Sequence, residues 1–201
     1  KTLAYQSIKN LSQGDKLFSG NIYTKTLGEP AAAVEVVKNA GLPQWSPDGK
    51  SLSFVRFQGV TPQIYKFSPA GGKESAVTSS GVTPVSYSLL PYNRTQASDI
   101  SWSPDGSRIA FDARRNGVSN IWLINQDGTN ETQITANENK ELIHSAPLWS
   151  ADGKTLAYTT RDKTPDDRFR YAINLMNVDE KSADPIYVGN SFIRLIGWKG
   201  P

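Results

Sequence analysis

The chain has 201 residues, of which 37% are hydrophobic and 20% charged, a composition typical of a globular protein rather than a disordered one. It contains no run of 18 or more apolar residues, so the sequence predicts no membrane span. The net charge is only +3 with scattered basic residues, which argues against a nucleic-acid partner, and the absence of cysteine excludes disulfides, thiolate zinc sites and cysteine nucleophiles.

The first forty residues contain three segments with the pattern of strands. Residues 1–5, Lys-Thr-Leu-Ala-Tyr, have the same sequence as residues 154–158, where we expect a strand. Residues 21–23 and 33–37 are short segments rich in β-branched and aromatic side chains, which favour strands. We therefore predict that this part of the chain forms strands two, three and four of a first repeat unit.

A five-residue motif divides the rest of the chain into repeats. Trp-Ser-Pro-Asp-Gly occupies residues 45–49 and 102–106, and Trp-Ser-Ala-Asp-Gly occupies 149–153, at spacings of 57 and 47 residues. Proline fixes φ at the second turn position, and glycine adopts the left-handed conformation at the end of the turn. Each motif, called a head below, predicts a hairpin turn between a strand that ends in Trp and a following apolar strand.

The same series of elements follows every head. A third strand is predicted at 63–65, 120–122 and 172–174, and a fourth strand follows a turn, as at 131–135. The middle strands are apolar on both faces, so both faces of each sheet must be covered. The sequence therefore predicts an all-β fold, a β-propeller of four-stranded antiparallel blades with four repeats.

The end of the chain leaves two arrangements open. Residues 192–198 end in Ile-Gly-Trp and look like the strand that leads to another head. In one arrangement this strand completes the first blade, and residues 1–201 form a single domain, a closed four-bladed ring without a free edge. In the other, the four repeats are part of a larger propeller.

The three heads and the apolar strands that follow them resemble the WD-like propeller repeats of the TolB family. Similar repeats occur in the propeller domains of prolyl-oligopeptidase-type and tricorn-type peptidases. The resemblance implies a propeller, a periplasmic or secreted location in bacteria, and no catalytic residues, because the motif is a structural turn. The third head departs from the pattern, since Ala151 replaces the proline and weakens that turn.

The sequence predicts no catalytic residue, no cofactor and no metal site. Gly49-Lys50-Ser51 looks like the end of a P-loop, but Gln44 stands where that motif needs glycine. His144 is the single histidine, so a multi-histidine metal site is excluded, and no Gly-x-Ser-x-Gly elbow presents a serine. His144 and Asp99 lie beside inner strands, where we expect them to be candidates for ligand binding near the channel.

Three further candidate binding surfaces lie in insertions between strands. The longest insertion, residues 81–97, contains Tyr87, Tyr92 and Arg94, which are residue types that anchor protein interfaces. The charged segment 162–171, which includes Arg168, is a second candidate. Residues 6–21, at the equivalent position in the first unit, are a third.

Three functions remain open at this stage. The first is a non-catalytic propeller scaffold that binds a protein partner in a bacterial envelope. The second is a gating or accessory propeller of a peptidase-type enzyme. The third is a propeller that binds a carbohydrate or another small ligand on aromatic side chains. A propeller frame hosts many unrelated activities, so the repeat alone does not decide between them.

Overall fold

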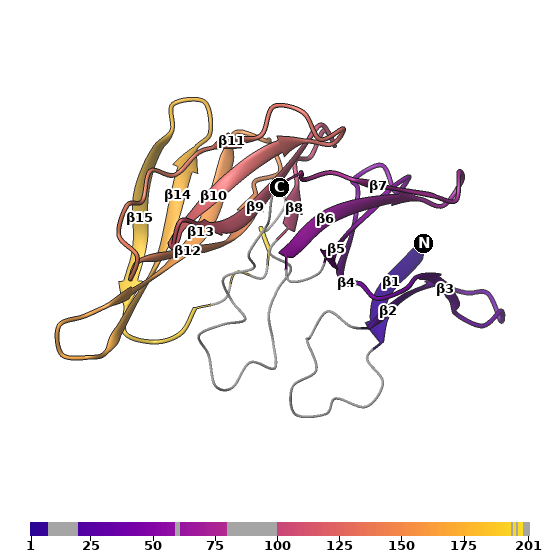
Figure 1. Cartoon of the computed structure of the whole chain (residues 1–201), viewed down its shortest axis with the longest axis horizontal. Coiled ribbons are helices and arrows are strands. Elements are labelled where there is room, and N and C mark those ends of the chain that lie inside the picture. Colours follow the sequence, from indigo (N-terminus) through magenta and orange to yellow (C-terminus); the bar gives the residue numbers. More distant parts are fainter. Residues whose placement is uncertain (8–19, 59–60, 80–99, 194, 196, 199–201) are drawn as a thin grey trace. The chain divides into compact units, whose positions relative to one another are not determined.

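The computed structural model describes residues 1–7, 20–58, 61–79, 100–193, 195, 197 and 198. These residues form strands and turns and contain no helix (Figure 1). The chain divides into two compact units, residues 1–81 and 82–201, and each is described by itself.

The first unit contains two antiparallel sheets whose strands follow one another in chain order. A three-stranded sheet consists of β1 (Thr2–Ser7), β2 (Asn21–Thr26) and β3 (Val34–Val37). A four-stranded sheet consists of β4 (Gly41–Trp45), β5 (Leu52–Gln58), β6 (Thr61–Ser68) and β7 (Lys73–Ala76). Apolar side chains from both sheets form one buried core, among them Ile22, Val37, Leu52, Phe54 and Tyr65.

The second unit contains two four-stranded antiparallel sheets (Figure 1). The third sheet consists of β8 (Ile100–Trp102), β9 (Arg108–Arg115), β10 (Val118–Asn125) and β11 (Thr132–Gln133). The fourth sheet consists of β12 (Ile143–Trp149), β13 (Thr155–Lys163), β14 (Phe169–Asn177) and β15 (Ser182–Gly189). Strand β12 contacts β8, β9 and β10, and the core between the two sheets includes Ile121, Leu123, Trp149, Leu156 and Met176.

The three heads form the predicted hairpin turns, and a buried serine holds each one. The serine hydroxyl donates a hydrogen bond of 2.6 Å to the aspartate two residues later, in the pairs Ser46–Asp48, Ser103–Asp105 and Ser150–Asp152. The same hydroxyl accepts a hydrogen bond from the backbone N–H five residues later. The glycines at the ends of the turns have φ of 69° at Gly49, 71° at Gly106 and 70° at Gly153, which favours glycine. The third head keeps all these bonds although Ala151 replaces proline.

The sheets confirm the prediction of an all-β propeller fold with antiparallel blades. The predicted third strands lie within β2, β6, β10 and β14. One prediction was too long: the strand expected at 131–135 is β11, which spans only Thr132–Gln133. Thr135 Oγ1 accepts the N–H of Ile121 at 2.9 Å, so a side chain replaces the next ladder bond and the chain leaves the sheet.

The ring-closing strand remains a prediction. Residues 192, 193, 195, 197 and 198 are described and belong to no strand, and Trp198 Nε1 donates a hydrogen bond of 3.2 Å to the carbonyl of Leu148 within the second unit. The first sheet has three described strands. Completion of the first sheet by residues 192–198 would be a contact between the two units. The closed four-bladed ring and the larger propeller are therefore both still predictions.

Candidate binding cleft

A cleft of about 600 Å³ lies between the third and fourth sheets of the second unit. Its cause is the shortness of β11, which pairs with β10 over only two residues, whereas β15 pairs with β14 along most of its length. Beyond β11, the segment 134–142 follows a non-strand path to β12, and it lines the cleft together with residues of the fourth sheet. We call this space the β11–β15 cleft.

Asparagine and threonine side chains fix the segment that forms one wall of the cleft. Asn120 Oδ1 accepts hydrogen bonds of 2.8 Å from the hydroxyl of Thr135 and from the backbone N–H of Asn137. Asn137 Nδ2 donates to three backbone carbonyls, those of Ser119, Asn139 and Leu142. Since these bonds replace a sheet ladder, the wall is held in one conformation although it is not a strand.

The face of the fourth sheet forms both the floor of the cleft and its opposite wall. Tyr158 of β13, Met176 of β14 and Ala183 of β15 present side chains to the cleft, and Leu142 adds a further apolar contact from the connecting segment. Tyr158 and Met176 are also members of the core between the sheets, where their exposed fractions are 5% and 2%. The floor of the cleft is therefore an apolar surface supported by the packed core beneath it.

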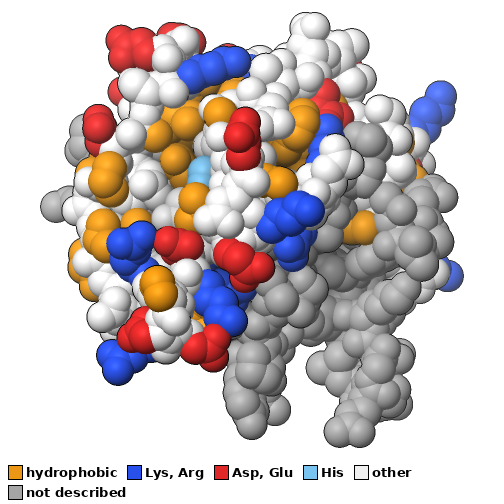
Figure 2. Space-filling model, turned by 60° about the vertical axis from the view of Figure 1, so that its left-hand side comes forward, with side chains coloured by type: hydrophobic (Ala, Val, Ile, Leu, Met, Phe, Trp, Pro, Cys, Tyr) orange, Lys and Arg blue, Asp and Glu red, His pale blue; other side chains and the backbone are white. Residues whose placement is uncertain are grey.

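His144 lies in this floor as a buried polar group. It is 8% exposed, and its ring lies 5.3 Å from that of Tyr158. Among the described residues, neither its Nδ1, which is buried, nor its Nε2 has a hydrogen-bond partner. Burial lowers the pKa of His144 to about 4, so the imidazole is neutral at pH 7. In Figure 2 the pale blue histidine is visible at the bottom of a hollow with hydrophobic side chains around it.

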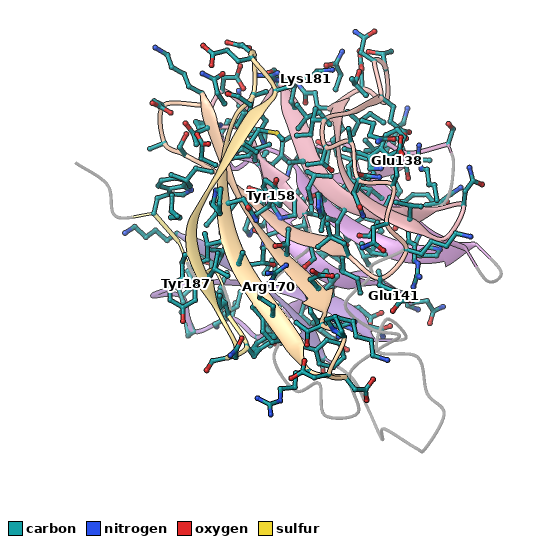
Figure 3. The ribbon with its side chains drawn as sticks, turned by 90° about the vertical axis from the view of Figure 1, so that its left-hand side faces the viewer. Glu138, Glu141, Tyr158, Arg170, Lys181 and Tyr187 are labelled. Atoms are coloured by element: carbon teal, nitrogen blue, oxygen red, sulfur yellow. The ribbon has the colours of Figure 1, made fainter. Side chains whose placement is uncertain are left out.

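Two charged side chains lie at the mouth of the cleft. Lys181 precedes β15, and Glu138 lies on the segment that follows β11 (Figure 3). Both are exposed, and neither forms an ion pair within the described part of the chain. The cleft therefore combines an apolar floor, a neutral hydrogen-bonding group and one free charge of each sign at its rim.

A smaller cleft of about 320 Å³ adjoins the first, and Gln133, Asn137 and Glu138 line both. Its other wall contains Trp122, with the guanidinium of Arg115 stacked 3.7 Å from the ring centroid. Arg115 is ion-paired with Glu131, so this wall carries no unpaired charge of its own.

The structure places two of the six predicted binding residues. His144 lies in the β11–β15 cleft. Arg168 lies at the tip of the β13–β14 hairpin, where its Nε is 3.1 Å from Asp166. Tyr87, Tyr92, Arg94 and Asp99 lie outside the described residues, as do residues 81–97 and most of 6–21.

The position of Arg168 follows from a turn that repeats the chemistry of the heads. The hydroxyl of Thr164 donates to Asp166 at 2.6 Å, and Asp167 has a φ of 62° where the heads have glycine. The turn holds Arg168 in solvent at the start of the returning strand. It does not bring Arg168 into the cleft.

The sequence analysis did not predict the other residues of the cleft, although the sequence contains one repeated pattern that marks the end of an outer strand. Val77-Thr78 and Ile134-Thr135 follow the fourth strands of two repeats, and both threonine hydroxyls accept the backbone N–H of a third-strand isoleucine. This pair marks where an outer strand ends. Within the described residues, no group of His, Asp or Glu is arranged to hold a metal ion, and no helix is long and apolar enough to cross a membrane.

Comparison with known proteins identifies the repeat. No protein-family model matches the chain. It is 30% identical over 108 residues to the Tol-Pal system protein TolB of Anaeromyxobacter dehalogenans, a match that covers 53% of this chain and 21% of that protein. It also superposes on TolB from Acinetobacter baumannii with a TM-score of 0.66 at 19% identity, over 92% of this chain and 40% of that one. The repeats are TolB-type propeller repeats.

Further solved structures share the propeller fold. A putative TolB from Agrobacterium tumefaciens superposes with a TM-score of 0.64 at 21% identity, covering 86% of this chain and 58% of that one. Dipeptidyl peptidase 4 from Porphyromonas gingivalis superposes with a TM-score of 0.57 at 15% identity, covering 86% and 29%. These likenesses show the fold alone. The matched segment spans about a fifth of the curated TolB relative, so the activity and partners of that whole protein are not established for this chain.

Proposed function

We propose that the chain is a non-catalytic TolB-type propeller that binds a protein partner in the bacterial periplasm, and that the β11–β15 cleft is a binding site for that partner. The observation that carries the proposal is the cleft itself. It is an apolar, preformed surface beside a buried histidine that has no hydrogen-bond partner among the described residues, on a repeat like that of a protein named for the Tol-Pal system.

The shape and chemistry of the cleft favour a protein segment as its occupant. Its apolar floor is supported by core residues and its wall by side-chain hydrogen bonds, so little conformational entropy is lost on binding. Exposed apolar surface rimmed by polar side chains is typical of interaction sites. Rigid frames with loops and clefts at their surface are the usual setting for such sites.

The alternative function, a propeller that gates a peptidase, has less support. It rests on the propeller fold shared with dipeptidyl peptidase 4, and a sequence identity of 15% does not indicate a shared function. A propeller that gates a peptidase needs a catalytic domain beside it, so the finding of a hydrolase domain in the same gene product would favour this alternative over a binding scaffold.

The test is affinity capture from a bacterial envelope extract, with the chain immobilised in three forms. Ala183→Trp fills the cleft, whereas Ser182→Trp places the same ring on the adjacent, exposed residue of β15 and is the matched control. We expect the wild type and Ser182→Trp to retain the same protein and Ala183→Trp to lose it. Direct binding of that protein, once purified, completes the test.

Two results would contradict the proposal. If no bait retains a protein that binds again after purification, the scaffold function is wrong. A fourth bait carries Tyr92→Ala and Arg94→Ala. If Ala183→Trp retains the protein while this fourth bait loses it, the partner binds the insertion at 81–97 and not the cleft.

A further inference from the structure

The polar groups of the cleft restrict what can occupy it. Neutral imidazole carries one proton, and an unpartnered buried N–H is rarer in proteins than an unpartnered acceptor. With Nδ1 buried and unpartnered, the proton is best placed on Nε2, which is the ring nitrogen left accessible. His144 then offers a hydrogen-bond donor to an acceptor in the cleft.

The floor selects a neutral, apolar group. Tyr158, Met176 and Ala183 provide contacts for an aliphatic side chain, and the hydroxyl of Tyr158 has no hydrogen-bond partner among the described residues. Burial also raises the pKa of Tyr158, so the phenol is protonated at neutral pH. A charged group placed on this floor would lose its hydration without an opposite charge to compensate. A peptide carbonyl is an acceptor that carries no such charge.

The rim carries one positive and one negative side chain, one on each wall, and therefore favours an occupant with charges of both signs. Lys181 lies on the fourth-sheet wall and Glu138 on the wall formed by the segment after β11 (Figure 3). Because neither is ion-paired within the described chain, an occupant that crosses the cleft can pair an acidic residue with Lys181 and a basic residue with Glu138. A lipid chain or a neutral sugar would leave both charges unused.

We infer that the β11–β15 cleft binds an extended peptide segment in which one aliphatic side chain is flanked by an acidic residue on one side and a basic residue on the other. The aliphatic side chain packs on Tyr158 and Met176. A backbone carbonyl of the segment accepts a hydrogen bond from His144. The charged neighbours reach Lys181 and Glu138. This inference rests on the proposed function and specifies the chemistry of the partner.

The composition of the chain provides a direct probe of the cleft. Met176 is the single methionine and His144 the single histidine, and both line the cleft. A protein labelled with ¹³C at the methionine methyl group therefore gives one methyl signal, and selectively labelled histidine gives one ring. The probes are two blocked heptapeptides, Gly-Ser-Asp-Leu-Lys-Ser-Gly and Gly-Ser-Lys-Leu-Asp-Ser-Gly, each with a control in which serine replaces leucine.

We expect one of the two leucine peptides to shift the Met176 methyl signal in a saturable way, with an affinity about tenfold higher than that of its reversed-charge counterpart. The serine peptides should bind at least about tenfold more weakly. A variant with Lys181→Glu and Glu138→Lys together should reverse the preference between the two orders. Glu141→Lys changes an exposed carboxylate of the same segment that does not line the cleft and should leave the preference unchanged.

Each outcome has a defined consequence. If no peptide moves the Met176 signal, if leucine and serine peptides bind equally, or if the charge swap leaves the preference unchanged, the inference is overturned. A purified partner that binds the chain without moving the signal would refute the cleft chemistry and leave the proposed protein binding intact. Saturable peptide binding in the absence of any captured protein would support the inference and count against an envelope partner.

Discussion

At the scale of single residues, the serine of each head is the residue that fixes the blade turns. Ser103 is 1% exposed, donates to Asp105 and accepts the N–H of Arg108. The pKa of Asp105 is lowered to about 2. The largest cause is the hydrogen bond from the Ser103 hydroxyl, followed by those from the backbone N–H and the hydroxyl of Ser107. Because the carboxylate form is favoured in the folded state, this stabilisation is present above the unfolded pKa near 4 and is lost as the pH falls toward 2.

We predict that Ser103→Ala lowers the free energy of unfolding by about 1–2 kcal/mol at pH 7, since it removes two hydrogen bonds of a buried hydroxyl. Urea unfolding followed by tryptophan fluorescence measures the change. Ser75→Ala, at an exposed serine of β7, is the control and should have no measurable effect. Equal effects of the two substitutions would show that the serine does not hold the turn.

His144 should give the stability of the chain a specific dependence on pH. Its pKa falls from 6.5 to about 4 in the folded state because of burial, so between these values the unfolded chain binds a proton that the folded chain does not. Stability attributable to this residue is therefore complete above pH 6.5 and decreases as the pH falls toward 4, by about 3 kcal/mol in total.

We predict that His144→Gln removes this component. The free energy of unfolding at pH 7 minus that at pH 4.5 should be smaller in the variant than in the wild type, since both share the same carboxylates. Titration of the single histidine ring by NMR provides an independent measurement and should give a pKa near 4. A pKa near 6.5 would mean that the ring is exposed to water, in conflict with a buried position in the cleft floor.

At the scale of elements, the third head shows how far local sequence determines a turn. Ala151 replaces proline, yet the turn keeps the 3.0 Å bond from the N–H of Gly153 to the carbonyl of Ser150, as the other heads do. The residue is exposed, and no described hydrogen bond uses its N–H. Proline at this position would therefore restrict the unfolded chain without loss of a bond in the folded state.

We predict that Ala151→Pro raises the free energy of unfolding by about 0.4–1 kcal/mol. Urea unfolding at neutral pH tests this, with Ala146→Pro as a contrast, because Ala146 has a φ of 53° that proline does not adopt. The contrast variant should be clearly destabilised. A loss of stability in Ala151→Pro would mean that the third turn differs from the other two.

The elements also show where prediction from the sequence stops. Turn residues and alternating strands at a repeated spacing located every head and every third strand, because their conformation depends on neighbours in the sequence. The end of β11 depends instead on Thr135 and Asn120, whose side chains meet only when the sheet is formed. The cleft follows from that short strand, so its lining residues, apart from His144, were not predicted.

At the scale of the whole chain, the repeated sequence predicts the fold. We expect the binding sites where the repeats differ from one another. The heads are nearly identical, but the outer strands vary from the two residues of β11 to the eight of β15. That difference is what opens the cleft in the second unit. The insertion at 81–97 is another place where the repeats differ, and its predicted binding residues remain untested.

The most direct test of the binding function is site-specific photo-crosslinking. The chain has no cysteine, so Ala183→Cys and Arg168→Cys each give one site for a benzophenone probe, in the cleft and at the hairpin tip. Both proteins are irradiated in envelope extract, and crosslinked proteins are identified by mass spectrometry. We predict that the probe at residue 183 captures one protein, through a peptide with an aliphatic side chain between an acidic and a basic residue, and that the probe at 168 does not. Capture at 168 alone would contradict a binding site in the cleft.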